Sequence, residues 1–314
     1  MLEGAGIRVL AGRYGGEASD STVAEHELRE EATEADGIIL GTAQMTEGVI
    51  RGLPRLRVIA RRGVGFDNVD VTAANEAGIV VSITRGAVEA TVAEHTLALI
   101  LCMAHHVAGG NDAIHRGEWP RMEGRLLAGA TLGVVGFGAV GQRVGRLARS
   151  LGMKVIVSEQ FPALVRGYPR VELAELLTEA DVVSIHVPGG DANRALIDDA
   201  ALRRMRPGSL LVNTARGGVV DEEALAAALR EGRLGGAALD VLVTEPPRSA
   251  ALIDVPNLVM TPQIAGYSRE ASVAANVMAA ESVVRVLTGR RLPRRWIIGS
   301  RQVARRRQSE VIEA

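Results

Sequence analysis

The sequence predicts an α/β fold with two doubly wound domains, one of them inserted into the other. The chain has 314 residues, which is enough for about two domains of ~100–200 residues each. Short apolar runs alternate with helical patterns, and this alternation occurs in two separate series. Two long helical patterns, residues 88–107 and 269–287, follow the first and the second series, where connecting helices would lie.

The expected strands are short runs rich in Val, Ile and Leu. Many are continuous rather than alternating, which is typical of parallel strands with both faces covered. Helical stretches lie between them, such as residues 221–231, which end before Gly232. The first series comprises Ile7–Leu10, Gly37–Leu40, Arg57–Ala60 and Ile79–Ser82; the second comprises Thr131–Val135, Lys154–Ser158, Val182–Val187, Ser209–Asn213, Ala237–Val241 and Leu258–Thr261.

The two connecting helices indicate where the domains meet. The chain is expected to start in one domain, cross to the second through the first helix and return through the other. This predicts an outer domain of residues 1–95 and 268–314 and an inserted domain of residues 96–267.

Composition and charge narrow the class of protein. Apolar residues make up 47% and charged residues 23%, as in ordinary soluble enzymes. The formal net charge of −1 provides no field to attract nucleic acid or an anionic membrane. No run reaches the ~18 apolar residues of a membrane span, and the first residues lack the pattern of a secretory leader. We therefore expect a cytoplasmic protein without nucleic-acid or membrane partners.

Two further features have simple interpretations. Cys102 is the only cysteine, so no internal disulfide is expected, and no motif predicts a metal site. Residues 289–307 carry eight arginines around Leu292, Trp296 and Ile297. We interpret this stretch as a solvated extension, with an anion site or a subunit contact as the alternative.

A glycine motif in the second series predicts a dinucleotide site. Gly136, Gly138 and Gly141 follow a predicted strand and open a helix, the context in which GxGxxG is informative. The first glycine permits a tight turn, the second lets a pyrophosphate approach the backbone, and the third lets helix pack on strand. The helix start, at Ala139 and Val140, presents N–H groups to the phosphates. The inserted domain is therefore expected to be of the Rossmann type.

The next expected strand ends in an acid, Glu159, which lies 18 residues after Gly141. That distance is typical of the carboxylate that meets the adenosine ribose hydroxyls. A carboxylate there repels a 2′-phosphate, and no arginine follows in residues 160–162, so the predicted cofactor is NAD rather than NADP. FAD is disfavoured because the motif is internal and no second flavin signature occurs.

Several further segments carry a family resemblance. In order along the chain they are residues 62–70, 92–96, 182–188, 213–221, 239–246 and 261–266. Together they closely resemble the signatures of the D-isomer-specific 2-hydroxyacid dehydrogenases, the family that includes phosphoglycerate dehydrogenase. The resemblance implies a flavodoxin-like outer domain that binds the substrate, and hydride transfer between a 2-hydroxy acid and NAD.

The resemblance also implies roles for individual residues. Arg216 would grip the substrate carboxylate through two parallel hydrogen bonds and polarise the carbonyl. Glu245 would pair with a catalytic histidine, and Asp240 would lie near the nicotinamide carboxamide. Backbone N–H groups of Val64 and Gly65 would cradle the substrate carboxylate. Further cofactor contacts are expected at His186, Val187, Pro188, Thr214, Ala215, Gln263 and Gly266, with His186 structural or close to the cofactor.

One position breaks the family pattern. The acid/base histidine should follow Pro262, yet this chain has Gln263, and its last histidine is His186. An amide donates a hydrogen bond but exchanges no proton near neutral pH, whereas general acid/base catalysis contributes roughly 10²–10⁴-fold. Three interpretations stay open. Another acid acts, with Glu245 the nearest candidate if it is buried; the substrate needs less proton transfer; or the protein is catalytically weak.

Arginines cluster by motif near the substrate loop. They are Arg61, Arg62 and Arg85, of which Arg85 stands where the family often has proline. Extra guanidinium groups beside a carboxylate site indicate a substrate with a second anionic group, such as phosphate, phosphonate or carboxylate. The alternative is ordinary surface arginine.

These features predict an NAD-dependent oxidoreductase for a small, dianionic 2-hydroxy or 2-oxo acid or a related alcohol. The alternative is a catalytically weak NAD(H)-binding regulatory or interaction protein. Gln263 favours that alternative, whereas the retention of Arg216, Glu245 and Asp240 disfavours it. A homodimer is expected, built around the first connecting helix and an arm at residues 114–121.

Overall fold

The computed structural model describes residues 1–10, 12, 23–247 and 250–299. The chain divides into two compact units, Met1–Val88 with Tyr267–Ala314 and Glu89–Gly266. The sequence predicted the boundaries between residues 95 and 96 and between residues 267 and 268, whereas the units divide after Val88 and after Gly266. In the structure the whole first connecting helix belongs to the inserted unit, because its apolar side chains pack in that unit's core.

The outer unit is built on a four-stranded sheet in the order β1-β2-β3-β10. The first three strands are parallel and the last is antiparallel to β3; their bounds are β1 (Gly37–Leu40), β2 (Val58–Arg61), β3 (Val80–Ile83) and β10 (Ile297–Ile298). The helices are α1 (Glu25–Ala32), α2 (Glu47–Arg51), α3 (Val71–Glu76) and α10 (Arg269–Leu287). Ile59 of β2 packs with α2 and α3, whereas Val58 and Ala60 pack with α10. Helices therefore cover both faces of the sheet, as in a doubly wound domain.

Two expectations for the outer unit are wrong. Ile7–Leu10 forms no strand: Val9 and Leu10 are 50% and 57% exposed, so the segment lacks the burial that stabilises a strand. The stretch from Leu292 to Ile298 is not a solvated extension, because Trp296 and Leu292 complete the core beneath α10 and β10 pairs with β3. The arginines from residue 301 onward lie outside the described residues.

The inserted unit is built on a six-stranded parallel sheet in the order β5-β4-β6-β7-β8-β9. Its strands are β4 (Thr131–Val135), β5 (Lys154–Ser158), β6 (Val182–Ile185), β7 (Leu210–Asn213), β8 (Gly236–Leu239) and β9 (Leu258–Met260). Its helices are α4 (Glu89–Ala104), α5 (Val107–His115), α6 (Ala139–Ser150), α7 (Leu173–Glu179), α8 (Asp199–Arg204) and α9 (Glu222–Arg230). Side chains of α4 and α6 share one core with the sheet, and side chains of α7, α8 and α9 share the other.

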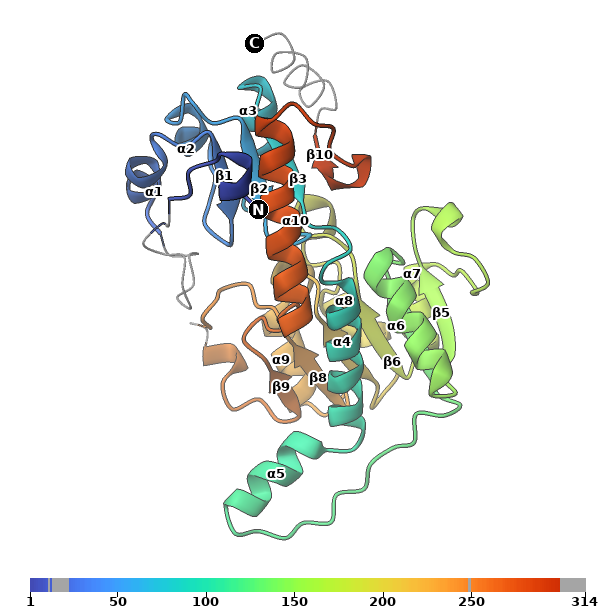
Figure 1. The fold of residues 1–314 in the computed structure, drawn as a ribbon. Coiled ribbons are helices and arrows are strands. Elements are labelled where there is room, and N and C mark those ends of the chain that lie inside the picture. The colour runs from blue at the N-terminus through green and yellow to red at the C-terminus, as the bar shows by residue number, and fades with distance from the viewer. Residues whose placement is uncertain (11, 13–22, 248–249, 300–314) are drawn as a thin grey trace. The chain divides into compact units, whose positions relative to one another are not determined.

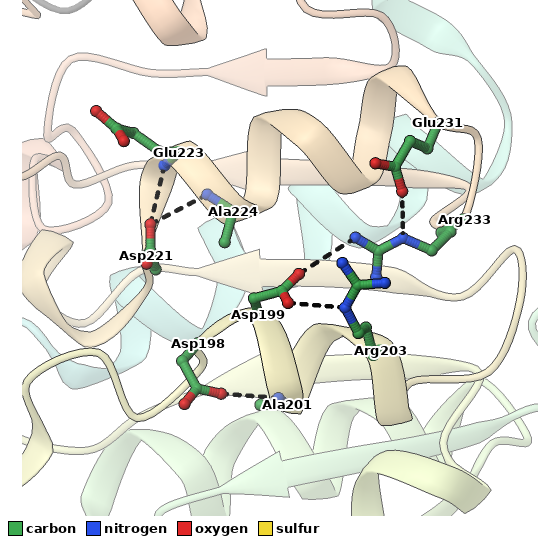
Figure 2. Close-up of polar contacts among 9 residues, drawn as sticks. All are labelled: Asp198, Asp199, Ala201, Arg203, Asp221, Glu223, Ala224, Glu231 and Arg233. Carbon is green, nitrogen blue, oxygen red and sulfur yellow. Dashed lines mark hydrogen bonds and ion pairs between the residues drawn. The ribbon is translucent and has the colours of Figure 1, made fainter.

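Aspartates define where two of these helices begin (Figure 2). The Asp198 carboxylate accepts the N–H of Ala201 at 2.8 Å at the start of α8. The Asp221 carboxylate accepts two N–H groups at the start of α9, at 3.1 and 3.0 Å. Each cap satisfies N–H groups that have no partner inside the helix, which stabilises the helix by about 1 kcal/mol. Because α9 follows directly after the segment that carries Arg216, its cap also limits where that segment ends.

Figure 1 shows α5 and the extended chain after it standing apart from the sheet of the inserted unit. Several large apolar side chains are exposed there, including Trp119 at 80% and Leu126 at 78%. Among the described residues no single helix is long and apolar enough to cross a membrane. The bent pair α4 and α5 meets the length and composition of a span only when taken together, and α4 packs in the core of its unit.

Candidate active site

The glycine turn lies where the strand order of the inserted sheet changes direction. β4 stands between β5 and β6, and in open α/β sheets ligands bind beyond the carboxyl ends of strands at such a point. Gly136 follows β4 with φ 88°. A Cβ at this position would lie 2.6 Å from the carbonyl oxygen of His186, so only glycine fits the turn.

Gly138 and Gly141 differ in what surrounds them. A Cβ on Gly138 would meet nothing within 4 Å, and Gly138 provides no side chain to cap α6, so the start of the helix is open to a phosphate. A Cβ on Gly141 would collide with the carbonyl oxygen of Gly136. The glycines therefore provide the tight turn, the open approach and the close packing that a bound dinucleotide requires.

Glu159 follows β5 and is held beside the glycine turn. Its Oε2 accepts the N–H of Phe137 at 2.7 Å, and its Oε1 accepts the N–H of Phe161 at 2.9 Å. A carboxylate has about four acceptor positions, so these two bonds leave capacity for ribose hydroxyls. The half-buried carboxylate and the glycine turn together fit NAD.

His186 follows β6 and its side chain is partly buried. Its Nε2 lies 2.8 Å from the Ser184 hydroxyl, and desolvation lowers the pKa of the imidazole to about 3. The ring is therefore neutral near neutral pH. A neutral ring suits a structural or cofactor-proximal histidine better than a proton donor.

The segment after β7 places Arg216. Asn213, fully buried at the end of the strand, accepts the Ala215 N–H at 3.0 Å and donates to the Arg216 carbonyl at 2.8 Å. The Arg216 side chain is half-buried, and its Nη1 donates to the Ala215 carbonyl at 2.6 Å. Gly217 follows, packed against the backbone of Leu242 so closely that a Cβ would not fit. These contacts restrict the backbone on both sides of the guanidinium.

Asp240 is the centre of a second segment. Its side chain is only 2% exposed and accepts three hydrogen bonds: from the Thr261 hydroxyl at 2.6 Å, and from the N–H groups of Ile264 and Ala265 at 2.9 Å each. All three donors come from the loop after β9. The loop therefore folds around the buried Asp240 carboxylate, which holds it through these hydrogen bonds.

Gln263 lies in the middle of this loop. Its N–H donates to the Asp240 carbonyl at 2.9 Å, and its φ of 52° is a left-handed conformation uncommon outside glycine. The side chain is exposed at the surface of the unit, and Gly266 ends the unit three residues later. The position at which the resemblance predicted a histidine is thus held by hydrogen bonds to Asp240.

Glu245 does not meet the condition set for it as a replacement acid. Its side chain is exposed, and its Oε1 accepts the N–H of Leu242 at 2.9 Å. A second carboxylate, Glu222, accepts the neighbouring Val243 N–H at 2.6 Å. Burial of Glu222, together with the negative charges of Glu245 and Asp221, raises the pKa of Glu222. Sequence analysis did not single out Glu222.

The loop after β2 in the outer unit is held by side chains. The Asn68 amide donates to the carbonyls of Gly41 and Ala43 at 3.3 and 2.7 Å, and Arg61 donates to the Asn68 side chain at 3.4 Å and to the Arg62 carbonyl. These bonds tie the carboxyl ends of β1 and β2 together. Val64 and Gly65 lie inside this braced loop, both half-buried.

Arg62 and Arg85 differ from the half-buried Arg61 in how far their side chains are exposed. β2 and β3 are adjacent and parallel, with Arg61 opposite Ile83, so Arg62 and Arg85 follow the same edge of the sheet. Both side chains are exposed. Among the described residues, no carboxylate lies within ion-pair distance of either guanidinium.

Comparison with known proteins agrees with this geometry. Residues 97–265 match the family model of the D-isomer specific 2-hydroxyacid dehydrogenase, NAD binding domain. The chain is 42% identical over 258 residues to (S)-sulfolactate dehydrogenase of Chromohalobacter salexigens, covering 80% of this chain and 84% of the relative.

The chain belongs to the D-isomer specific 2-hydroxyacid dehydrogenase family. It is also 38% identical to D-3-phosphoglycerate dehydrogenase of Methanocaldococcus jannaschii over 84% of this chain, but it spans only 52% of that relative's length. A solved structure from Thermus thermophilus superposes with a TM-score of 0.83 at 38% identity, covering 88% of this chain and 90% of the other. The prediction of an NAD-dependent oxidoreductase with a Rossmann domain and a second α/β domain is confirmed.

The predicted residues of this family member fall in two groups. Arg62, Val64, Gly65 and Arg85 belong to the outer unit, and all other predicted site residues belong to the inserted unit. Sequence analysis missed the roles of Asn213 and His95. His95 lies in α4, and its Nε2 lies 3.3 Å from the Thr261 hydroxyl and 3.5 Å from Asp240. No local pattern signals a contact between residues 166 positions apart.

Proposed function

We propose that this protein transfers a hydride between NAD and the C2 carbon of a small 2-hydroxy or 2-oxo acid that carries a second anionic group. One observation carries the choice of substrate class. Arg62 and Arg85 are exposed at the same sheet edge as the Val64–Gly65 backbone, and no described carboxylate neutralises them. The loop N–H groups suit one carboxylate, and the two guanidinium groups suit a further anion.

In this proposal, residues of the inserted unit bind the substrate and orient its C2 oxygen. Bound NAD supplies the hydride acceptor, or NADH the donor. Arg216 binds the substrate carboxylate with two parallel N–H groups and orients the C2 oxygen. Asp240 holds the loop that carries Gln263, whose amide donates a hydrogen bond to the C2 oxygen without releasing a proton. The proton of the alcohol therefore reaches water by a route that includes no imidazole at position 263.

The sulfolactate relative supports a sulfonate as the second anion. Its name denotes a 2-hydroxy acid that carries a sulfonate group, and the phosphoglycerate relative's name denotes a hydroxy acid with a phosphate. Both groups present three oxygens to guanidinium donors. The proposed substrate class is therefore a small 2-hydroxy acid whose C3 carbon carries a sulfonate, phosphate, phosphonate or carboxylate group.

The test is a substrate panel followed by NADH absorbance. It compares sulfolactate, phosphoglycerate, a phosphono analogue and malate with lactate, which lacks the second charge. We expect kcat/KM for the best dianionic substrate to exceed that for lactate by at least ~10-fold, since one additional charged hydrogen bond contributes about 1.5–3 kcal/mol. Equal or higher kcat/KM for lactate would refute the dianionic class.

Gln263 favours one second candidate, an NAD(H)-binding regulatory protein. The two candidates make different predictions in the same assay. A regulator binds NADH in a fluorescence titration yet turns over no substrate in the panel, whereas the proposed enzyme does both. Restoration of turnover on ordinary 2-oxo acids by Gln263→His would identify the parent as a disabled dehydrogenase.

We also propose that two copies associate through α5 and the arm that follows it. Trp119, Leu126 and Val107 are 80%, 78% and 58% exposed, and large apolar side chains gathered in one segment are typical of an interface. Sedimentation should show a dimer at micromolar concentration. Trp119→Asp should shift the population toward monomer, and an unmodified protein that sediments as a monomer would refute this proposal.

A further inference from the structure

Two consecutive residues of α4, His95 and Thr96, contact the two segments that carry Arg216 and Gln263. Both residues and both segments belong to the inserted unit. His95 contacts the loop after β9, and Thr96 contacts the segment after β7. One turn of one helix thus meets both segments, which arrive from different strands of the sheet.

The direction of the hydrogen bonds at His95 follows from counting protons. The Thr261 hydroxyl has one proton, and it donates this proton to the Asp240 carboxylate at 2.6 Å. The contact of 3.3 Å between His95 Nε2 and the Thr261 oxygen therefore requires the histidine to be the donor. The same Nε2 lies 3.5 Å from Asp240 Oδ1. His95 thus donates to the same hydroxyl that donates to the buried carboxylate, and its ring nitrogen lies beside that carboxylate.

The same count fixes the direction at Thr96. Its hydroxyl donates to the Val92 carbonyl at 2.7 Å, one turn earlier in α4. The contact of 2.9 Å with the Thr214 hydroxyl therefore has Thr214 as the donor. Thr96 is fully buried and Thr214 is 8% exposed, so an unpaired hydroxyl at either position lacks water to replace its partner. Thr214 stands two residues before Arg216.

We propose that His95 and Thr96 are positioning residues that set the Gln263 loop and the Arg216 segment against one rigid helix. Neither residue is assigned a contact with the substrate. Each acts on one segment: His95 through Thr261 and Asp240, and Thr96 through Thr214. The proposal rests on the proposed function, because that function assigns Arg216 and Gln263 to the substrate. The contacts of His95 and Thr96 do not depend on that assignment.

Amide hydrogen exchange tests the two links separately, and each variant serves as the control for the other. His95→Leu should accelerate exchange about threefold to tenfold in residues 261–266, where Ile264 and Ala265 bond to Asp240, and leave residues 213–217 unchanged. Thr96→Val should accelerate exchange in residues 213–217 and leave residues 261–266 unchanged. Equal acceleration of both segments by both variants, or of neither, would overturn the proposal.

Conservative variants and kinetics separate positioning from general stability. His95→Gln and Thr96→Ser keep a donor and a hydroxyl, so both should stay within about threefold of the parent kcat. His95→Leu should lower kcat by ~10-fold or more, because small displacements of catalytic groups reduce rates strongly, while the Kd for NADH changes less than about twofold. An unchanged kcat in His95→Leu would contradict the proposal.

Two further variants keep the test decisive. Should leucine at position 95 prevent folding, His95→Asn removes the same link, because the shorter amide side chain does not reach the Thr261 hydroxyl, and it should accelerate exchange in the same residues. Thr178→Val removes an exposed hydroxyl that bonds to Glu175 in α7 and should change neither exchange nor kcat. If the parent turns over no substrate, the proposed function fails, and the exchange data still decide whether the two links position the segments.

Discussion

Two charged regions of the molecule are organised in opposite ways. One is the pair Arg62 and Arg85, which follow the carboxyl ends of β2 and β3 in the outer unit. The other is Asp240 with the loop after β9, in the inserted unit. Arg62 and Arg85 are exposed, and no described carboxylate neutralises them. Asp240 is buried, and each of its carboxylate oxygens accepts at least one hydrogen bond. A charge with no protein partner is available to a ligand, whereas a buried charge enclosed by donors holds the structure around it.

The difference indicates that the two regions have different roles. Under the proposed function, Arg62 and Arg85 recognise the substrate, so their replacement should alter specificity more than stability. Asp240 and the loop after β9 hold Gln263 in that proposal, so replacement of Asp240 should alter stability and turnover together.

Asp240→Asn should damage both folding and turnover. An amide presents a donor where the carboxylate meets the Thr261 hydroxyl and two N–H groups, so at least one buried donor loses its partner. We expect a loss of about 2–4 kcal/mol in the free energy of unfolding, measured with urea, and a fall of ~100-fold or more in kcat/KM. Asp198→Asn is the matched control, because asparagine caps α8 nearly as well. Similar losses in both variants would contradict the special position of Asp240.

Arg216→Lys should abolish most activity without a comparable loss of stability. Lysine keeps the charge but lacks the second parallel N–H donor. A buried substrate carboxylate that is only half paired loses about 2–5 kcal/mol of binding free energy. Steady-state kinetics should show kcat/KM reduced by at least ~30-fold. Arg203→Lys, at an exposed ion pair with Asp199, should leave the kinetics unchanged. Activity within about threefold of the parent would mean that Arg216 does not bind the substrate.

Arg62→Gln and Arg85→Gln should act on substrate choice. At least one of the two variants should raise KM for a dianionic substrate by ~10-fold while KM for lactate changes less than about twofold, since one charged hydrogen bond contributes about 1.5–3 kcal/mol. Arg55→Gln, at an exposed arginine paired with Asp36, is the control. Equal effects on lactate and on the dianion would remove the basis for a second anionic group.

Gln263→His should lower turnover on the best substrate a few-fold rather than raise it. In the proposed site a neutral amide donates to the C2 oxygen, and an imidazolium would place a charged donor there. The pH profile of kcat should show an additional ionisation in the variant. A turnover increase of ~10-fold or more on the same substrate would show that the parent lacks an acid it needs.

His186 should make stability depend on pH. Its folded-state pKa is about 3, below the usual value of 6.5, because burial disfavours the charged ring. Between these values the unfolded chain binds a proton that the folded chain does not, so stability is full above about pH 6.5 and falls as the pH decreases toward 3. His186→Asn should therefore flatten the dependence of urea unfolding on pH between about 4 and 6. An unchanged slope in the variant would mean that this histidine does not contribute.

Local sequence was sufficient for the cofactor turn and much of the fold. Gly136, Gly138 and Gly141 lie within six residues, and their roles follow from backbone conformation and the helix start. Continuous apolar runs predicted all six strands of the inserted sheet, because parallel strands are buried on both faces. The same rules failed at Ile7–Leu10, where the apolar Val9 and Leu10 are exposed, and at β10, where two residues form a strand because β3 offers a partner.

By itself, the sequence determined that this chain is a Rossmann-type NAD enzyme of the 2-hydroxyacid family, since those features are short-range patterns. Only the tertiary structure decided what holds the chemistry. His95 meets Thr261 across 166 residues, Glu245 is exposed rather than buried, and Arg61 braces a loop while Arg62 and Arg85 stay exposed. Burial and partner choice depend on which distant segments fold together, and the type of a residue does not record them.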